Sequence, residues 1–149
     1  MTDPQTAELE IPAESRFVAA ARNFVTEEAR SAGWMQESQL DDLRLVVSET
    51  VTNALRAHVD RHVDELIKVR SAVFDDRVEI SVADFAGGFE VPTDIASLPD
   101  PDPRSEGGFG LPLIEALSDE AHFTRTIEGT VVRLVVYRVG RSASGTITG

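Results

Sequence analysis

The chain has 149 residues, 42% of them hydrophobic and 27% charged, which are ordinary values for one soluble globular domain with its own core. It has no cysteine, and it shows neither an apolar run that could span a bilayer nor a basic-then-apolar leader. Disulfides, thiolate metal sites and membrane-spanning helices are therefore excluded, and a cytoplasmic location is expected. The net charge of −12, from 14 basic and 26 acidic residues, repels nucleic acid phosphates and attracts a basic protein partner.

The N-terminal part predicts a strand followed by a helix. Residues 1–6 are expected to be flexible. A short half-buried strand follows, because Ala7, Leu9 and Ile11 alternate with glutamates. An amphipathic helix is predicted from about residue 15, and Gly33 is a typical stop.

The stretch from Leu43 to His58 predicts the central helix, which we place at about residues 37–59, with Ser38 as a possible N-cap. The three histidines, His58, His62 and His122, show no metal-ligand spacing, and we interpret them as incidental. One arc of the helix is predicted to be buried because its residues recur at helical spacing: Leu40, Leu43, Val47, Thr50, Val51 and Ala54.

A polar pair lies on a second arc of this helix. Glu49 and Asn53 are one turn apart and therefore neighbours. Leu45 and Val46 flank the pair, which predicts a carboxylate partly withdrawn from water and in need of a partner. On an arbitrary helix, such a pair would more often be two solvated side chains.

Two strands are predicted at about residues 67–73 and 77–82. In the second, Val78, Ile80 and Val82 alternate with polar residues, and Asp84 shares their parity. If the strand continues, the Asp84 carboxylate lies on the core side and must be hydrogen-bonded. The sequence offers no obvious basic partner, which favours a ligand donor. The alternative is that the strand ends at Val82 and Asp84 opens a turn.

Residues 85–110 are predicted to form a long irregular segment of the kind that makes lids. The segment ends in a glycine cluster, Gly107 to Gly110, directly before a short apolar helix with Pro112 in its first turn. Glycine backbone and free helix amides suit a phosphate, although glycines before a helix also form ordinary tight turns.

The remaining residues predict a hairpin: a strand over 123–127, a turn at Glu128–Gly129, and a last strand from Thr130. One face of the last strand is more apolar than a solvated face, which favours a subunit contact there: Val131, Val135 and Tyr137. Residues 140–149 are rich in Ser and Gly and are predicted to be disordered.

Four motifs occur in a fixed order: Glu49-x-x-x-Asn53, Asp84-Phe-Ala-Gly-Gly88-Phe89, Gly108-Phe-Gly110-Leu-Pro-Leu113 and Gly129-Thr130. Together they resemble the N, G1, G2 and G3 boxes of the GHKL, or Bergerat-fold, ATPases. The stretch Val-Val-Ser-Glu-Thr-Val-Thr-Asn-Ala is similar to the N box of bacterial anti-sigma-factor serine kinases. One box is a weak motif, whereas four in order over residues 7–139 make a strong match.

The resemblance implies an α/β (α+β) two-layer sandwich, with a mixed, mostly antiparallel sheet and helices on one face. It implies ATP or ADP and Mg²⁺ as ligands. Glu49 would be the general base, Asn53 the magnesium ligand, and Asp84 the acceptor for the adenine amino group, supported by Thr130. The other implied nucleotide-binding residues are Ala86, Gly88, Phe89, Arg104, Gly108, Phe109, Gly110 and Leu111.

The sequence departs from the family pattern at two of these positions. Ala86 stands where the G1 box usually has its first glycine, and Phe109 stands where related proteins often carry a basic residue. Arg104 is then the nearest cation for the γ-phosphate, or else an exposed lid residue.

The function implied is that of an ATP-dependent anti-sigma factor, acting as a homodimer. It would sequester a sigma factor and phosphorylate a serine on an anti-anti-sigma (STAS-domain) antagonist. The alternative is a non-catalytic nucleotide-binding module, which Ala86 and Phe109 keep open. A two-component histidine kinase is disfavoured because no helical segment with a phospho-acceptor histidine precedes the domain. A kinase acting on another STAS scaffold remains open.

Overall fold

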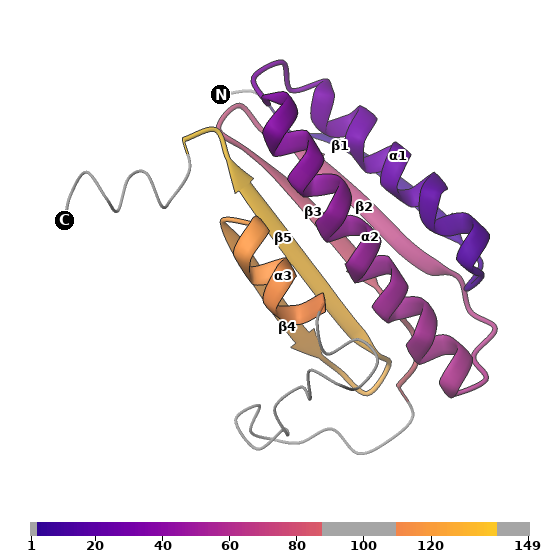
Figure 1. Cartoon of the computed structure of the whole chain (residues 1–149). Coiled ribbons are helices and arrows are strands. Elements are labelled where there is room, and N and C mark those ends of the chain that lie inside the picture. The colour runs from indigo at the N-terminus through magenta and orange to yellow at the C-terminus, as the bar shows by residue number, and fades with distance from the viewer. Residues whose placement is uncertain (1–2, 88–109, 140–149) are drawn as a thin grey trace.

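The computed structural model describes residues 3–87 and 110–139, which form one sheet covered by helices. The sheet has five strands in the order β1-β2-β3-β5-β4, and α1, α2 and α3 lie on one of its faces (Figure 1). In chain order the elements are β1 (Gln5–Ile11), a 3₁₀ turn (Ser15–Phe17), α1 (Val18–Arg30), α2 (Glu37–Asp60), β2 (Ile67–Val73), β3 (Arg77–Ala83), α3 (Gly110–Leu117), β4 (Glu120–Arg125) and β5 (Thr130–Tyr137).

This architecture confirms the predicted two-layer α/β sandwich. All four strand pairings of the described sheet are antiparallel, so the parallel pair of a mixed sheet is absent from the described residues. Over the same residues, no helix is both long and apolar enough to cross a bilayer.

Two strand boundaries differ from the prediction. β1 begins at Gln5, inside the segment expected to be flexible, because Gln5 and Thr6 continue the ladder with β2. β4 occupies Glu120–Arg125 instead of 123–127, because the hairpin closes earlier, through two backbone hydrogen bonds between Thr126 and Gly129. Ile127 therefore lies in the turn and is 73% exposed.

The buried face of α2 forms the centre of the core. All six residues predicted on this arc are buried, and they pack on the inward residues of the sheet, among them Val69, Ile80 and Leu134. Each fully buried aliphatic side chain of this kind contributes about 1.5–3 kcal/mol to folding. α1 and α3 pack against opposite flanks of α2 (Figure 1), so the helix carrying Glu49 and Asn53 is fixed on the sheet from both sides.

α2 begins at Glu37, as predicted, but its N-cap residue differs from the prediction. The N-cap is Gln36, not Ser38. Gln36 and Gln39 form a reciprocal capping box, in which the backbone N–H of Gln36 donates to the Gln39 side chain at 2.9 Å.

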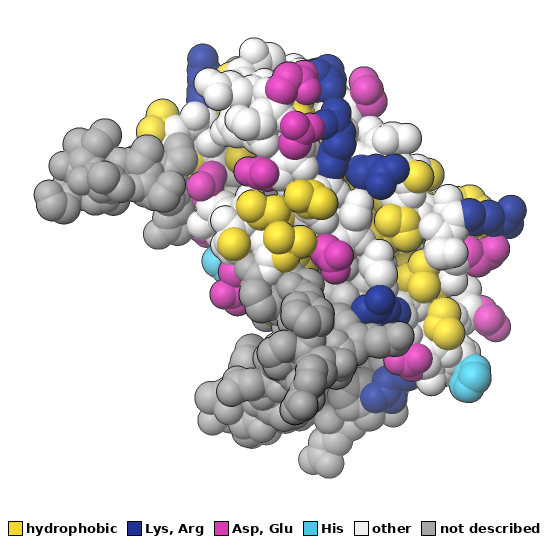
Figure 2. Space-filling view, in the orientation of Figure 1, with side chains coloured by type: hydrophobic (Ala, Val, Ile, Leu, Met, Phe, Trp, Pro, Cys, Tyr) yellow, Lys and Arg dark blue, Asp and Glu magenta, His cyan; other side chains and the backbone are white. Residues whose placement is uncertain are grey.

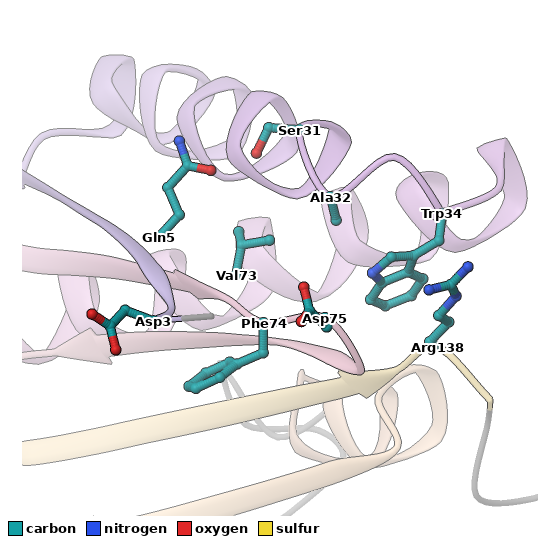
Figure 3. Close-up of a pocket in the computed structure, with 9 residues that line it drawn as sticks. All are labelled: Asp3, Gln5, Ser31, Ala32, Trp34, Val73, Phe74, Asp75 and Arg138. Carbon is teal, nitrogen blue, oxygen red and sulfur yellow. The ribbon is translucent and has the colours of Figure 1, made fainter. Parts of the chain in front are cut away.

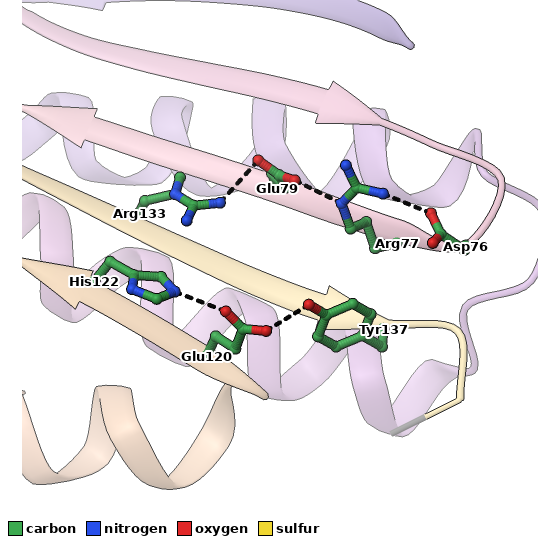
Figure 4. A network of polar contacts seen from close by, with 7 residues as sticks. All are labelled: Asp76, Arg77, Glu79, Glu120, His122, Arg133 and Tyr137. Carbon is green, nitrogen blue, oxygen red and sulfur yellow. Dashed lines mark hydrogen bonds and ion pairs between the residues drawn. The ribbon is translucent and has the colours of Figure 1, made fainter. Parts of the chain in front are cut away.

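The outer face of β5 is not the apolar surface that the sequence indicated. Val135 is only 1% exposed within this one chain, and Tyr137 donates its hydroxyl to Glu120. His122 contacts the other oxygen of the same carboxylate at 2.7 Å (Figure 4). Of the three residues predicted to make a subunit contact, Val131 alone is an exposed apolar group, so this face no longer favours a dimer interface.

A second group of charges lies beside the first on this face. Glu79 accepts from Arg77 at 2.6 Å and from Arg133 at 3.1 Å (Figure 4). The hydrogen bond and the charge of Glu79 raise the pKa of Arg77 above its ordinary value. On β3, β4 and β5 the outer face is therefore a hydrogen-bonded polar surface, whose partly exposed ion pairs contribute little to stability individually.

Candidate functional site

Asp84 lies where β3 ends, and its carboxylate is oriented by backbone groups. β3 ends at Ala83, but pairing with β5 continues for one more residue, because the Asp84 N–H donates to the Thr130 carbonyl at 2.9 Å. Oδ1 of Asp84 accepts from the backbone N–H of Thr130 at 3.1 Å and of Ala86 at 3.2 Å. The other oxygen, Oδ2, has no hydrogen-bond partner among the described residues. The half-buried carboxylate therefore keeps one acceptor for a ligand.

Thr130 contacts Asp84 directly. The contact runs through its backbone N–H, so it does not depend on the threonine side chain. The two positions are therefore in contact, whereas the role of Thr130 in adenine binding stays a prediction.

His58 joins α2 to this strand end. Its side chain is fully buried, and Nε2 accepts the backbone N–H of Phe85 at 2.8 Å. The interpretation of His58 as incidental was wrong. The available signal was its spacing, because His58 lies one turn beyond Ala54 and so continues the apolar arc of the helix. A histidine on a buried arc needs a polar partner.

The four consecutive amides of residues 84–87 are all hydrogen-bonded. The first and last donate to β5 and its turn: Asp84 to Thr130, and Gly87 to the Glu128 carbonyl at 3.0 Å. The Ala86 amide donates to Oδ1 of Asp84, and the Phe85 amide donates to His58. The 84–87 segment is thus held by the hairpin on one side and by α2 on the other.

Two glycines permit this close packing. A Cβ on Gly87 would lie 2.0 Å from the Ile127 carbonyl oxygen. A Cβ on Gly129 would lie 2.1 Å from the carbonyl oxygen of Asp84 and 2.8 Å from its Oδ1. Both collisions involve backbone atoms, which cannot move aside as a flexible side chain would.

We expect Gly129→Ala to destabilise the fold by about 3 kcal/mol, because the methyl group drives the Asp84 backbone away from β5. Gly33→Ala is the control: that glycine has a φ of +82° but no atom within 4 Å of its Cβ position, so only backbone strain of about 1–2 kcal/mol is expected. Urea unfolding of both variants measures the difference. Equal losses would show that the collision does not matter.

Glu49 and Asn53 lie on α2 as predicted, and both are partly buried. Oδ1 of Asn53 is shielded from solvent and has no hydrogen-bond partner among the described residues. A buried oxygen without a hydrogen-bond partner lowers the stability of the fold. A cation bound to this oxygen would supply the missing partner. The apolar surroundings predicted for Glu49 are only half present, because Val46 is buried but Leu45 is 53% exposed.

The described side chains do not form a metal site made of protein ligands alone. Within the described ranges, no group of three or more His, Asp or Glu side chains could hold a metal ion. Magnesium is commonly bound through one or two protein oxygens, with waters and substrate phosphates completing its shell. The single unpartnered oxygen of Asn53 fits that mode of binding.

Several predicted site residues lie outside the described residues: Gly88, Phe89, Arg104, Gly108 and Phe109. Gly110 and Leu111 open α3, which confirms a helix directly after the glycine cluster. Ala86 is 5% exposed, and its amide is bonded within the 84–87 segment, so this segment accommodates the alanine.

A separate cavity of about 210 Å³ lies at the opposite end of β3, between the start of β1, the α1–α2 loop and the β2–β3 turn (Figure 3). Trp34, Asp75 and Arg138 are among its lining residues. The length of β3 separates it from Asp84 by about 20 Å. It therefore belongs to a different part of the molecule from the site described above.

On the face shown in Figure 2, acidic and basic side chains are interspersed, and hydrophobic side chains form several separate groups. Exposed apolar residues of the described chain include Leu45, Val59 and Leu66. Separate groups of this kind are normal for a folded surface and do not mark an interface by themselves.

The sequence matches a known protein family and several of its members. Residues 11–136 match the model of the family described as the histidine kinase-like ATPase domain. A serine-protein kinase RsbW of Bacillus velezensis is 34% identical over 140 residues, which are 89% of this chain and 86% of the relative. The RsbW kinases of Bacillus subtilis and Listeria monocytogenes are each 30% identical, covering 89% and 75% of this chain and 86% and 74% of the relatives.

A solved structure shares the fold. The crystal structure of the RsbU and RsbW domains of a Mycobacterium tuberculosis protein superposes with a TM-score of 0.65 and 23% sequence identity. The match covers 89% of this chain and 31% of that chain.

Proposed function

Because the chain belongs to the family of histidine kinase-like ATPase domains, and within it to the RsbW serine-protein kinases, we propose that it binds ATP and transfers the γ-phosphoryl group to a serine of a partner protein. The observation that carries this proposal is the hydrogen-bonded link from α2 to the strand end. His58 fixes Phe85, and the adjacent Asp84 is fixed by Thr130. The helix with Glu49 and Asn53 is therefore hydrogen-bonded to the segment that carries the proposed adenine acceptor, which supports a shared site.

Each residue has a separate task in this proposal. Oδ2 of Asp84 accepts a hydrogen bond from the exocyclic amino group of adenine. Oδ1 holds the carboxylate in place through its hydrogen bonds from Ala86 and Thr130. Oδ1 of Asn53 would hold Mg²⁺, which when bound neutralises phosphate charge. Gly108 and Gly110 would supply backbone amides to the phosphates.

Glu49 takes the proton of the attacking serine hydroxyl. A bond forms between the serine oxygen and the γ-phosphorus, and the bond from that phosphorus to the β,γ-bridging oxygen breaks. ADP leaves with that electron pair. A positioned general base of this kind contributes typically 10²–10⁴-fold to the rate.

The proposed partners are a sigma factor, which the protein sequesters, and an anti-anti-sigma (STAS-domain) protein, which carries the acceptor serine. A net charge of −12 favours association with basic protein segments over nucleic acid. Such a switch operates in the cytoplasm, where sigma factor and ATP are both present. A homodimer also remains part of the proposal, without support from the outer face of the sheet.

The transfer is tested directly by incubating the protein with radiolabelled ATP, Mg²⁺ and the purified STAS-domain antagonist. We expect label on a serine of the antagonist, and loss of sigma-factor binding when unphosphorylated antagonist is added. Nucleotide binding without any transfer would instead support the non-catalytic module.

Asn53→Ala tests whether Asn53 binds Mg²⁺ without contributing to the stability of the fold. We expect this variant to unfold at the same urea concentration as the wild type or higher, because Oδ1 has no partner to lose among the described residues. Its ATP affinity should fall by about 100-fold in Mg²⁺ and should no longer change when EDTA is added. Calorimetry with and without EDTA measures both. A variant whose affinity still depends on Mg²⁺ would contradict the assignment.

A further inference from the structure

We propose that His58 is a positioning residue for the nucleotide base: its imidazole holds the 84–87 segment in the conformation in which Asp84 meets adenine. The inference rests on the proposed function, because it assigns a role within the same site. It adds a residue of α2 to the contacts that hold the segment around Asp84, which otherwise come from β5, its turn and the segment itself.

The geometry gives His58 a role that the other contacts do not duplicate. Of the four amides in the 84–87 segment, two are bound by β5 and its turn and one by the Asp84 carboxylate. The remaining amide, that of Phe85, is bound by Nε2 of His58 at 2.8 Å. This is the contact by which α2 holds the residue next to Asp84.

The same contact fixes the protonation pattern of the ring. Because the Phe85 N–H is a donor, Nε2 must be the unprotonated acceptor. The proton of the neutral ring then lies on Nδ1, which is itself buried and without a partner among the described residues. The side chain is fully buried, so bulk solvent does not compete for this contact in the folded chain.

Loss of the contact should weaken nucleotide binding as well as the fold. Without an acceptor, the Phe85 amide would be unpaired in the conformation described above, so the 84–87 segment would spend part of its time displaced from α2. Apparent affinity falls in proportion to the fraction of binding-competent molecules. Phosphoryl transfer from ATP already bound should change little, because Glu49 and Asn53 lie on α2 and not in the 84–87 segment.

The test compares His58→Leu, which removes the acceptor, with His58→Gln, whose side-chain oxygen can reach the position of Nε2. We expect the Leu variant to raise the Kd and KM for ATP about tenfold with kcat within about twofold. The Gln variant should restore most of the affinity. His122→Leu, at an exposed position on β4, is the matched control and should bind ATP as the wild type does.

Unchanged affinity in His58→Leu, or a Gln variant as weak as Leu, would overturn the proposal. If the Leu variant does not fold, nitrogen NMR of the imidazole in the wild type decides. A proton on Nε2, or a Phe85 amide whose exchange is not slowed by ATP, contradicts the proposed role; a proton on Nδ1 together with an amide protected by ATP supports it. A wild type that does not bind ATP refutes the proposed function itself, whereas a failure confined to these variants refutes the role of His58.

Discussion

Asp84→Asn should lower ATP affinity by about 100-fold or more and leave the fold intact. Oδ1 of Asp84 accepts two backbone N–H groups, from Ala86 and Thr130, and an asparagine carbonyl oxygen can accept the same two. At the other position the variant presents an NH₂ donor to the donating amino group of adenine. The result is the loss of a charge-assisted hydrogen bond and a new donor–donor contact.

A second variant distinguishes the effect on ATP binding from the effect on the stability of the fold. Asp84→Ala is the comparison, because it removes both oxygens: it should bind ATP as poorly as the asparagine variant but should also unfold at lower urea concentration. Calorimetry gives the affinity, and the increase in melting temperature at saturating ATP provides an independent measure, since a ligand of the native state must stabilise it. Near-normal affinity in Asp84→Asn would show that adenine is bound elsewhere.

Glu49→Gln should lower the rate of phosphoryl transfer by about 10³-fold while ATP affinity changes less than about twofold. The amide keeps the shape of the side chain but cannot accept the serine proton. The residue is partly buried on α2, one turn before Asn53, so the substitution leaves the packing of the helix unaltered. Single-turnover transfer from labelled ATP to the STAS-domain serine measures the chemical step alone.

Glu37→Gln is the matched control for this variant, because it makes the same chemical change in the first turn of the same helix. Glu37 is exposed and pairs with Arg30 at 2.8 Å, far from the site, so transfer should proceed at the wild-type rate. Transfer by Glu49→Gln at a rate near that of the control would assign proton removal to another group.

The sequence predicted the architecture well because periodicity and motif order are local signals. The alternation of Val78, Ile80 and Val82 and the apolar arc of α2 each specified which face is buried, and both agree with the structure. The parity of Asp84 likewise indicated a carboxylate that needs partners. Those partners proved to be backbone amides, which a search for basic side chains cannot find.

The incorrect predictions concern the exposure and the contacts of side chains, which depend on how the strands and helices pack together. Whether Val135 faces water depends on neighbouring strands, since residues of β3 and β4 flank it on the outer face. Leu45 and Val46 are adjacent in sequence but differ from 53% to 1% in exposure, because about 100° of helix rotation separates them. The contact between His58 and Phe85 joins residues 27 positions apart, and no local pattern encodes it.

The strand order has a consequence for biosynthesis. Of the described strands, β5 is made last, yet it lies between β3 and β4 (Figure 1). While the chain emerges from the ribosome, β3 therefore presents an open edge, and such edges favour aggregation. A product terminated before Thr130 would also lack the amide that orients Asp84. ATP in the cell would thus stabilise finished chains only, and truncated ones would be left to chaperones and proteases.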